Sequence, residues 1–260
     1  MEKGKLIQEY RPSKAMWGVY WLLIGFFVLL AICGIALTFA LPGAEFAGKF
    51  IFVFCMVMAI IFYVSAKKKM NIPVYLLYEN GVERQYKSQT YYMPLAGLHD
   101  LFLFTTGKSM APNNLAFKSS GSDIWELINI NHGGDLAELI NANAKKRSEY
   151  LLQQIKDGQT ANFNYITSAT ALKNSFTALS TQTFLNSQSK QLGINGKYLI
   201  VDGTQYPLSS LQPLQHSSLK GYFIKTTDGK EVFAFRETTL WSFMVFMVLF
   251  ADLTKENVAA

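Results

Sequence analysis

The chain has 260 residues, half of them apolar, and a net charge of +6. The positive charge lies mainly in residues 1–69, which hold eight Lys or Arg and three Asp or Glu, whereas residues 70–157 sum to −1 and residues 158–260 to +2. A nucleic-acid-binding protein concentrates Lys and Arg on its folded domain, so this distribution argues against nucleic acid as a partner. Both cysteines, Cys33 and Cys55, lie in apolar segments; they are interpreted as small buried residues, although the sequence leaves a disulfide between them open.

Residues 17–69 predict a transmembrane helical hairpin that follows a basic cytoplasmic N-terminus, residues 1–16. Residues 17–40 are 24 uncharged positions, and residues 50–66 form a second apolar segment of 17. A bilayer core of about 30 Å needs about 20 apolar residues in a helix, so the second segment is near the lower limit. Leu41-Pro42-Gly43 predicts the turn. A secretory signal has a shorter apolar region, so the first segment is interpreted as a permanent span.

Basic and aromatic residues at the ends of these segments predict the orientation. The connecting turn holds one glutamate and one lysine, so the excess of positive charge elsewhere places both termini in the cytoplasm. Trp17, Tyr20, Trp21 and Tyr63 suit an aromatic belt on the same side. We expect a two-span protein of the inner (cytoplasmic) membrane, with membrane lipids among its partners. The basic residues expected to flank the membrane are Lys3, Lys5, Arg11, Lys14, Lys67, Lys68 and Lys69.

Residues 70–157 predict a first unit of antiparallel strands closed by one helix. The segments on either side of Glu79-Asn80-Gly81 are rich in strand-forming residues and alternate between apolar and polar positions, which is typical of a hairpin. Asp135 is placed to cap a helix, with Glu138 three residues later, and Gly158 is placed to end it. The expected strands are residues 74–78, 82–87, 90–94, 98–105, 114–118 and 124–128.

Residues 158–260 predict a second unit with the same order, in which a polar segment is inserted at about residues 168–190. That segment has no sustained period and is interpreted as a long loop or a poorly specified helix. Residues 94–98 (PLAGL) and 207–211 (PLSSL) take corresponding places, and so do Gly121 and Gly229 in their hairpins. This suggests a duplication, with chance similarity of short strings as the alternative. Strands are expected at residues 197–201, 205–208, 222–225 and 231–235, and a helix from about Thr238 or Thr239.

This order of elements resembles that of pleckstrin-homology-like (PH-like) domains, in which a bent antiparallel sheet is closed by a C-terminal amphipathic helix. Two such units behind a transmembrane hairpin are similar to membrane-anchored bacterial PH-like proteins, many of unknown function. The resemblance covers residues 71–260 and rests on element order and hairpin spacing. It implies a membrane hairpin followed by an α+β body of two PH-like units. Lipid-binding PH domains use Lys and Arg between their first two strands, where this chain is expected to place Glu79 and Glu83, which argues against phosphoinositide headgroups.

Residues 240–250 are apolar on nearly every face of the expected final helix. Eleven residues span only about 16 Å as a helix, which is too short for a bilayer. Three interpretations stay open: the core helix of the second unit, a helix lying on the membrane or on a partner, and a short third span. The candidate interaction surface therefore consists of Arg84, Lys87, Trp241, Phe243 and Phe246.

The sequence carries no recognisable catalytic or metal-binding pattern. His99, His132 and His216 lie outside metal-ligand spacing of one another and are interpreted as turn or surface residues. We expect no catalytic residue, cofactor or metal, and a membrane-anchored, non-enzymatic module that binds a protein partner or a lipid headgroup at the inner membrane face. The alternatives are an immunity protein against a membrane-acting toxin and an enzyme with an unrecognised site. The identity of the partner and the oligomeric state stay open.

Overall fold

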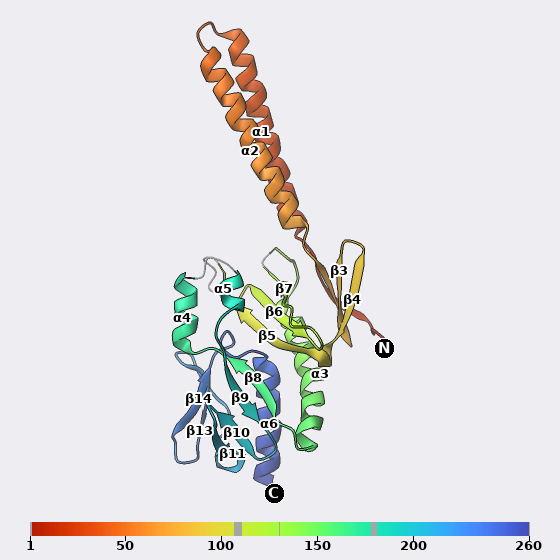
Figure 1. Cartoon of the computed structure of the whole chain (residues 1–260), viewed down its shortest axis with the longest axis vertical. Coiled ribbons are helices and arrows are strands. Elements are labelled where there is room, and N and C mark those ends of the chain that lie inside the picture. Colours follow the sequence, from red (N-terminus) through yellow and green to blue (C-terminus); the bar gives the residue numbers. More distant parts are fainter. Residues whose placement is uncertain (1, 107–110, 130, 178–180, 260) are drawn as a thin grey trace.

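The structure, a computed structural model, consists of a long pair of helices that projects from an α+β body (Figure 1). It describes residues 2–106, 111–129, 131–177 and 181–259. The helices are α1 (Lys14–Ala40), α2 (Glu45–Met70), α3 (Leu136–Lys156), α4 (Ser168–Thr177), α5 (Thr181–Leu185) and α6 (Phe243–Ala259).

Within the described residues, the strands of the body form four antiparallel sheets. The first sheet contains β1 (Leu6–Tyr10), β2 (Val74–Tyr78), β3 (Gly81–Tyr86) and β4 (Gln89–Pro94), and the second contains β5 (Leu98–Phe104), β6 (Asn114–Ser119) and β7 (Glu126–Ile128). The third contains β8 (Ala161–Tyr165), β9 (Lys190–Ile194), β10 (Tyr198–Val201) and β11 (Thr204–Pro207), and the fourth contains β12 (Gln215–Ser217), β13 (Gly221–Lys225) and β14 (Glu231–Phe235).

The helix pair is longer than the two apolar segments, because both helices continue through their charged ends. Both are long and apolar enough to cross a membrane. They pack through small residues: a Cβ on Gly48 would lie 2.5 Å from the Thr38 methyl group and 2.6 Å from the Gly34 carbonyl oxygen. Such contacts let two helix backbones approach closely without a hydrophobic driving force. Cys33 and Cys55 are free thiols. Cys55 is buried and Cys33 is exposed, so the expectation that both are buried holds for Cys55 alone.

The helix pair is inserted into the first sheet, which the sequence did not predict. Strand β1 precedes the helices and pairs with β2 after them, with Tyr10 opposite Tyr75. Residues 1–16 therefore contain a strand, and the connection between the first two strands is the helix pair itself. The turn at Glu79–Gly81 joins the second and third strands, so the expectation that it joins the first two was wrong.

Apart from the inserted helices α1, α2, α4 and α5, the elements of the body follow a similar order twice. The first half of the body runs from β1 to α3 and the second half from β8 to α6. Each half contains a four-stranded meander, a short 3-10 turn and a three-stranded sheet, and ends with a helix. The two 3-10 turns, Leu95–Gly97 and Leu208–Ser210, follow Pro94 and Pro207, and each is closed by the same backbone hydrogen bond. The PLAGL and PLSSL segments thus occupy equivalent places in two similar chains of elements.

The helices α3 and α6 pack side by side along one side of the body (Figure 1). The Asp135 side chain accepts a hydrogen bond from the Ala137 amide at 2.9 Å, which confirms the predicted cap of α3. The last helix begins at Phe243 rather than at Thr238 or Thr239. Its start is delayed because Ser242 is in the left-handed region (φ 52°) and Leu240 first pairs with Tyr165.

Reciprocal hydrogen bonds fix the second half to the first. The Ser242 amide donates to the Leu101 carbonyl oxygen at 2.7 Å, and the Leu101 amide donates to the Ser242 hydroxyl at 3.1 Å. One buried apolar cluster also includes residues of both halves, such as Phe117 and Phe246. The body is therefore one packed structure rather than two loosely tethered domains.

The polar segment at 168–190 contains the short helices α4 and α5 in its described parts and leads into β9. Strand β9 was not predicted, because its sequence KQLGI is short and follows a polar stretch. It pairs with both β8 and β10, and its Leu192 and Ile194 are buried. Tertiary pairing therefore decides its conformation.

The close approach at Gly48 leads to a first prediction. Gly48→Leu should separate α1 from α2 and lower stability by about 1–3 kcal/mol, because a side chain there has no room. Thermal unfolding of the detergent-solubilised protein would measure the change. Gly25→Leu is the matched control, since a Cβ on Gly25 meets nothing within 4 Å. Equal melting temperatures for the two variants would contradict the packing described here.

Candidate functional site at the base of the helix pair

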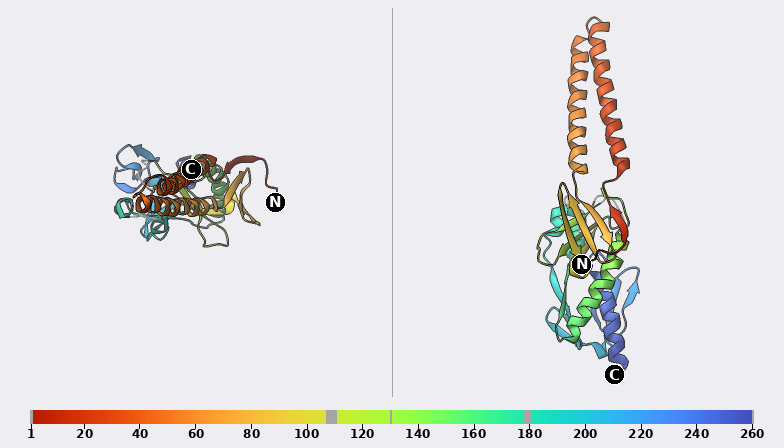
Figure 2. Two further views of the ribbon diagram at one scale, coloured as in Figure 1. Left: turned by 90° about the horizontal axis from the view of Figure 1, so that it is seen from above. Right: turned by 90° about the vertical axis from the view of Figure 1, so that its right-hand side faces the viewer.

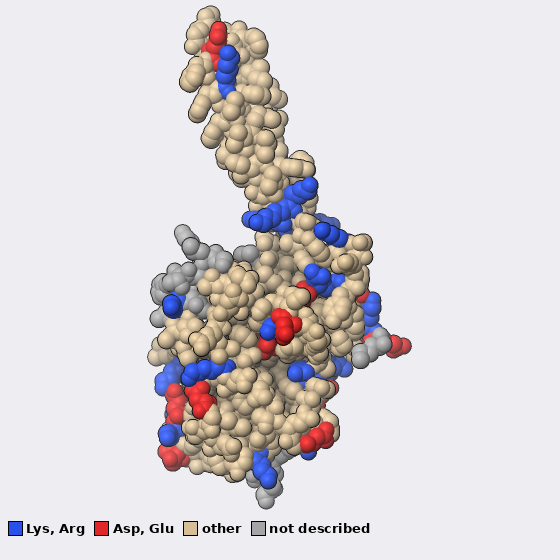
Figure 3. All heavy atoms as spheres, viewed as in Figure 1, with Lys and Arg blue, Asp and Glu red and all other residues tan. Residues whose placement is uncertain are grey.

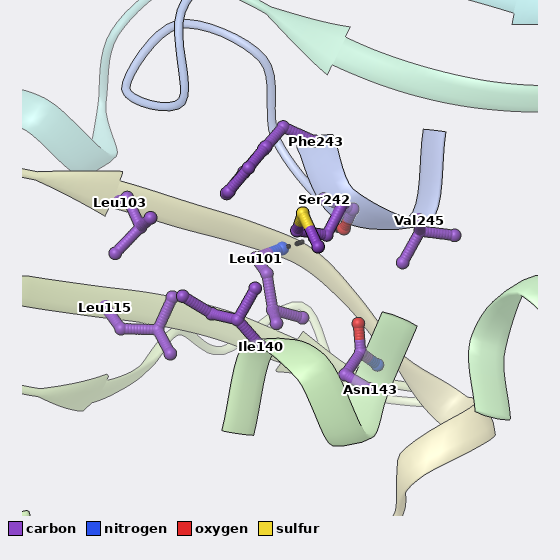
Figure 4. A pocket seen from close by; sticks show the side chains of 9 residues that line it. Leu101, Leu103, Leu115, Ile140, Asn143, Ser242, Phe243 and Val245 are labelled. Carbon is purple, nitrogen blue, oxygen red and sulfur yellow. Dashed lines mark hydrogen bonds between the residues drawn. The ribbon is translucent and has the colours of Figure 1, made fainter. Parts of the chain in front are cut away.

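Among the described residues, the cavity at the junction of β5, α3 and α6 is small. Its volume is about 10 Å³, and it is lined by Leu101, Asn143 and Ser242 among others (Figure 4). That volume suits about one water molecule. The Asn143 amide nitrogen donates to the Leu95 carbonyl oxygen at 2.9 Å, whereas its buried side-chain oxygen has no protein partner. The cavity is therefore a small packing defect, and the Asn143 side-chain oxygen is the polar atom there that has no hydrogen-bond partner among the described residues.

The aromatic residues of the candidate interaction surface belong to the core. Trp241, Phe243 and Phe246 are 5%, 7% and 0% exposed. Trp241 packs against Phe102 and Trp125, with ring centroids 5.2 and 5.3 Å apart. Of the three interpretations of residues 240–250, the core helix is the one that the structure supports. The prediction of a surface formed by these three side chains was wrong, because α6 is covered by sheets and by α3.

The two basic residues of that candidate surface have different surroundings. Arg84 forms an ion pair with Glu126 at 3.0 Å, and Glu126 also accepts a hydrogen bond from the Tyr75 hydroxyl at 2.7 Å. Arg84 therefore belongs to a network within the first half. Lys87 is exposed in the turn between β3 and β4, with its ammonium group 5.3 Å from the centre of the Tyr86 ring.

Lys3 and Lys5 do not flank the helix pair. They precede β1, so about 17 Å of strand separates them from α1. The Lys3 ammonium pairs with the buried Glu83 carboxylate, and the Lys5 amide donates to the Glu79 carboxylate at 3.1 Å. Both lysines fix the end of the first sheet that points away from the helices.

The other predicted flanking residues do gather at the base of the helix pair (Figure 3). Lys14 is the first residue of α1, and Lys67, Lys68 and Lys69 lie in the last turn of α2. Arg11 pairs with Glu9 at 2.6 Å and lies three residues before Lys14 in the sequence. The lysines at the end of α2 also compensate the negative end of the helix dipole.

A loop of the body holds both ends of the helix pair. The Ser13 amide donates to the Asn131 carbonyl oxygen at 3.0 Å, and the Gly133 amide donates to the Arg11 carbonyl oxygen at 2.8 Å. On the α2 side, Nε2 of His132 lies 3.0 Å from the Pro73 carbonyl oxygen. Residues 131–133 therefore clamp the entry and the exit of the helices to the body.

Burial favours the neutral form of His132 in this clamp. Its Nδ1 lies 3.1 Å from the Asn129 amide nitrogen and 3.2 Å from the Asn129 side-chain oxygen, and its Nε2 lies 3.0 Å from the Pro73 carbonyl oxygen. Burial lowers the pKa of His132 below its ordinary value of 6.5. The interpretation of His132 as a simple turn or surface residue was incomplete, since its contact with Pro73 joins positions 59 residues apart.

A groove opens between the two helices just above this clamp. The helices are closest near Gly34 and Gly48 and separate toward the body (Figure 2). The resulting groove has a volume of about 400 Å³. Its lining includes Trp17, Trp21 and Ile24 from α1 and Tyr63, Lys67 and Asn71 from the end of α2. The Trp17 and Trp21 rings are stacked, with centroids 5.9 Å apart.

This base is the candidate functional site, because it combines a groove, aromatic side chains and a cluster of cations. The described residues include no group of three His, Cys, Asp or Glu side chains that could hold a metal. The sequence indicated the cations and the aromatic belt, but the groove and the clamp depend on contacts that no local pattern encodes. Comparisons with protein-family models, with curated proteins and with solved structures find no match for this chain.

The clamp leads to a second prediction. Because burial in the folded protein favours the neutral form of His132, its contribution to stability is complete above pH 6.5 and is lost as the pH falls below that value. Amide exchange in residues 131–133, corrected for the intrinsic rate, should therefore increase as the pH is lowered from about 7.5 to about 5. His132→Gln should abolish this dependence, and His216→Gln, at an exposed position, should retain it.

Proposed function

We propose that this protein is anchored in the cytoplasmic membrane by α1 and α2 and that its body is a non-enzymatic interaction module at the inner face. Large apolar side chains on the outer surface of the helix pair support the anchor. Phe39, Phe46 and Leu22 are 86%, 83% and 72% exposed, and such a surface is unfavourable in water. Both helices also have the length that a bilayer of about 30 Å requires.

The charge distribution supports a cytoplasmic body. Lys14 and Lys67 to Lys69 surround the base, whereas the tip carries Glu45 and Lys49 (Figure 3). Positive charge accumulates on the cytoplasmic side of membrane proteins, so the base and both termini are assigned to the cytoplasm.

The order of elements in both halves supports the proposal that they are PH-like units. Seven strands in two sheets precede one closing helix, and this order occurs twice. In the first half, the long connection between the first two strands forms the anchor. The proposal thus describes a PH-like unit whose first loop has become a membrane hairpin.

One observation carries the assignment of an interaction module: both ends of the anchor are fixed to the same sheet and the same loop of the body. Tyr10 pairs with Tyr75 across the insertion, and His132 contacts Pro73. This arrangement holds the body in a defined orientation below the membrane, as a docking platform requires.

The proposal predicts the outcome of fractionation followed by affinity purification. The full-length protein should stay in the membrane fraction during alkaline extraction, because α1 and α2 are embedded in lipid. Purified in mild detergent, it should bring one protein partner in stoichiometric amount. Release by alkaline extraction would contradict the anchor. Purification without a protein partner, together with turnover of a substrate by the purified protein, would contradict the interaction module.

A further inference from the structure

The charged and amide groups that line the groove lie at one end of it. Lys67 and Asn71 lie at the end nearest the body, beside Trp17 and Met70, whereas Ile24 lies about two helical turns closer to the tip. Trp21 and Tyr63 line the part between them. A molecule that fills this groove must therefore have a polar end next to the lysine and an apolar end between the aromatic side chains.

Lys67 is available for an anionic ligand. Among the described residues no carboxylate lies within ion-pair distance of its ammonium group, whereas Arg11 and Arg84 are paired with Glu9 and Glu126. The neighbouring Lys69 is placed over the Tyr20 ring, at 5.6 Å from its centre. The local field at the groove is positive, and it favours a phosphate over a zwitterionic or cationic group.

We infer that this groove binds one anionic phospholipid of the inner leaflet. The phosphate would lie at Lys67 and Asn71, and the upper acyl chains would lie against Trp21, Tyr63 and Ile24. The volume of about 400 Å³ holds the headgroup and the first part of the chains. The inference rests on the proposed anchor, because it requires the base of the helices to lie at the level of the headgroups.

Lipid selectivity of the purified full-length protein tests this site. The protein in detergent is mixed with equal amounts of phosphatidylglycerol and phosphatidylcholine that have the same acyl chains, and bound lipids are counted by native mass spectrometry. Phosphatidylglycerol should be bound in preference. Lys67→Gln should reduce the ratio of the two lipids about fivefold, which corresponds to the loss of one lysine contact with an anionic headgroup. Trp21→Ala should weaken the binding of both lipids.

Matched controls separate this site from general electrostatics. Lys68→Gln removes the same charge one position away, outside the groove lining, and should leave the ratio nearly unchanged. Equal losses for Lys67→Gln and Lys68→Gln would overturn the inference, and so would a wild-type protein without preference. Free glycerol 3-phosphate should not compete, because the apolar part of the groove contributes to binding; full competition would contradict a lipid as the ligand. A protein that stays in the membrane but lacks selectivity refutes the site without refuting the anchor.

Discussion

The pairing of β1 with β2 is the constraint on which the rest of the structure depends. These strands are separated by the whole helix pair, yet Tyr10 lies opposite Tyr75 in one antiparallel ladder. The buried Tyr10 also donates a hydrogen bond from its hydroxyl to the Asp135 carbonyl oxygen at 2.8 Å. This hydrogen bond places the end of β1 against the start of α3. Without this closure the helix pair would be a tether attached at one end, and the groove at its base would have no fixed geometry.

Contacts between the two halves of the body stabilise the structure on which the paired strands β1 and β2 rest. Asp100 and Ser242 both have left-handed backbone conformations, with φ of 54° and 52°, at the point where the halves meet. Such conformations are unfavourable for residues other than glycine, so the surrounding contacts must compensate for them. The reciprocal bonds between Leu101 and Ser242, and the bond from Asn164 to Asp100 at 2.9 Å, provide part of that compensation. The base of the helices is thus mounted on a continuous core.

Sequence patterns predicted the elements whose signals are local. The apolar segments, the hairpins at residues 79–81 and at Gly229, the cap of α3 and the corresponding PLAGL and PLSSL turns all appear in the structure. Strand β1 could not be predicted because LIQEY is short and half polar, and its partner lies more than 60 residues away. For the same reason the sequence did not indicate that Lys3 pairs with Glu83, or that His132 reaches Pro73. The cations and tryptophans of the candidate site were predicted individually, whereas the groove they form depends on how α1 and α2 separate.

Hydrogen exchange of the full-length protein in lipid nanodiscs tests the central claim, that the helix pair is an insertion closed by β1. Amides of Leu6–Tyr10 should exchange slowly and in step with those of Val74–Tyr78, because the two strands share one ladder. If residues 6–10 exchanged at the rate of an unstructured terminus while β2 stayed protected, the helix pair would be attached to the body at one end only, and the account would be wrong.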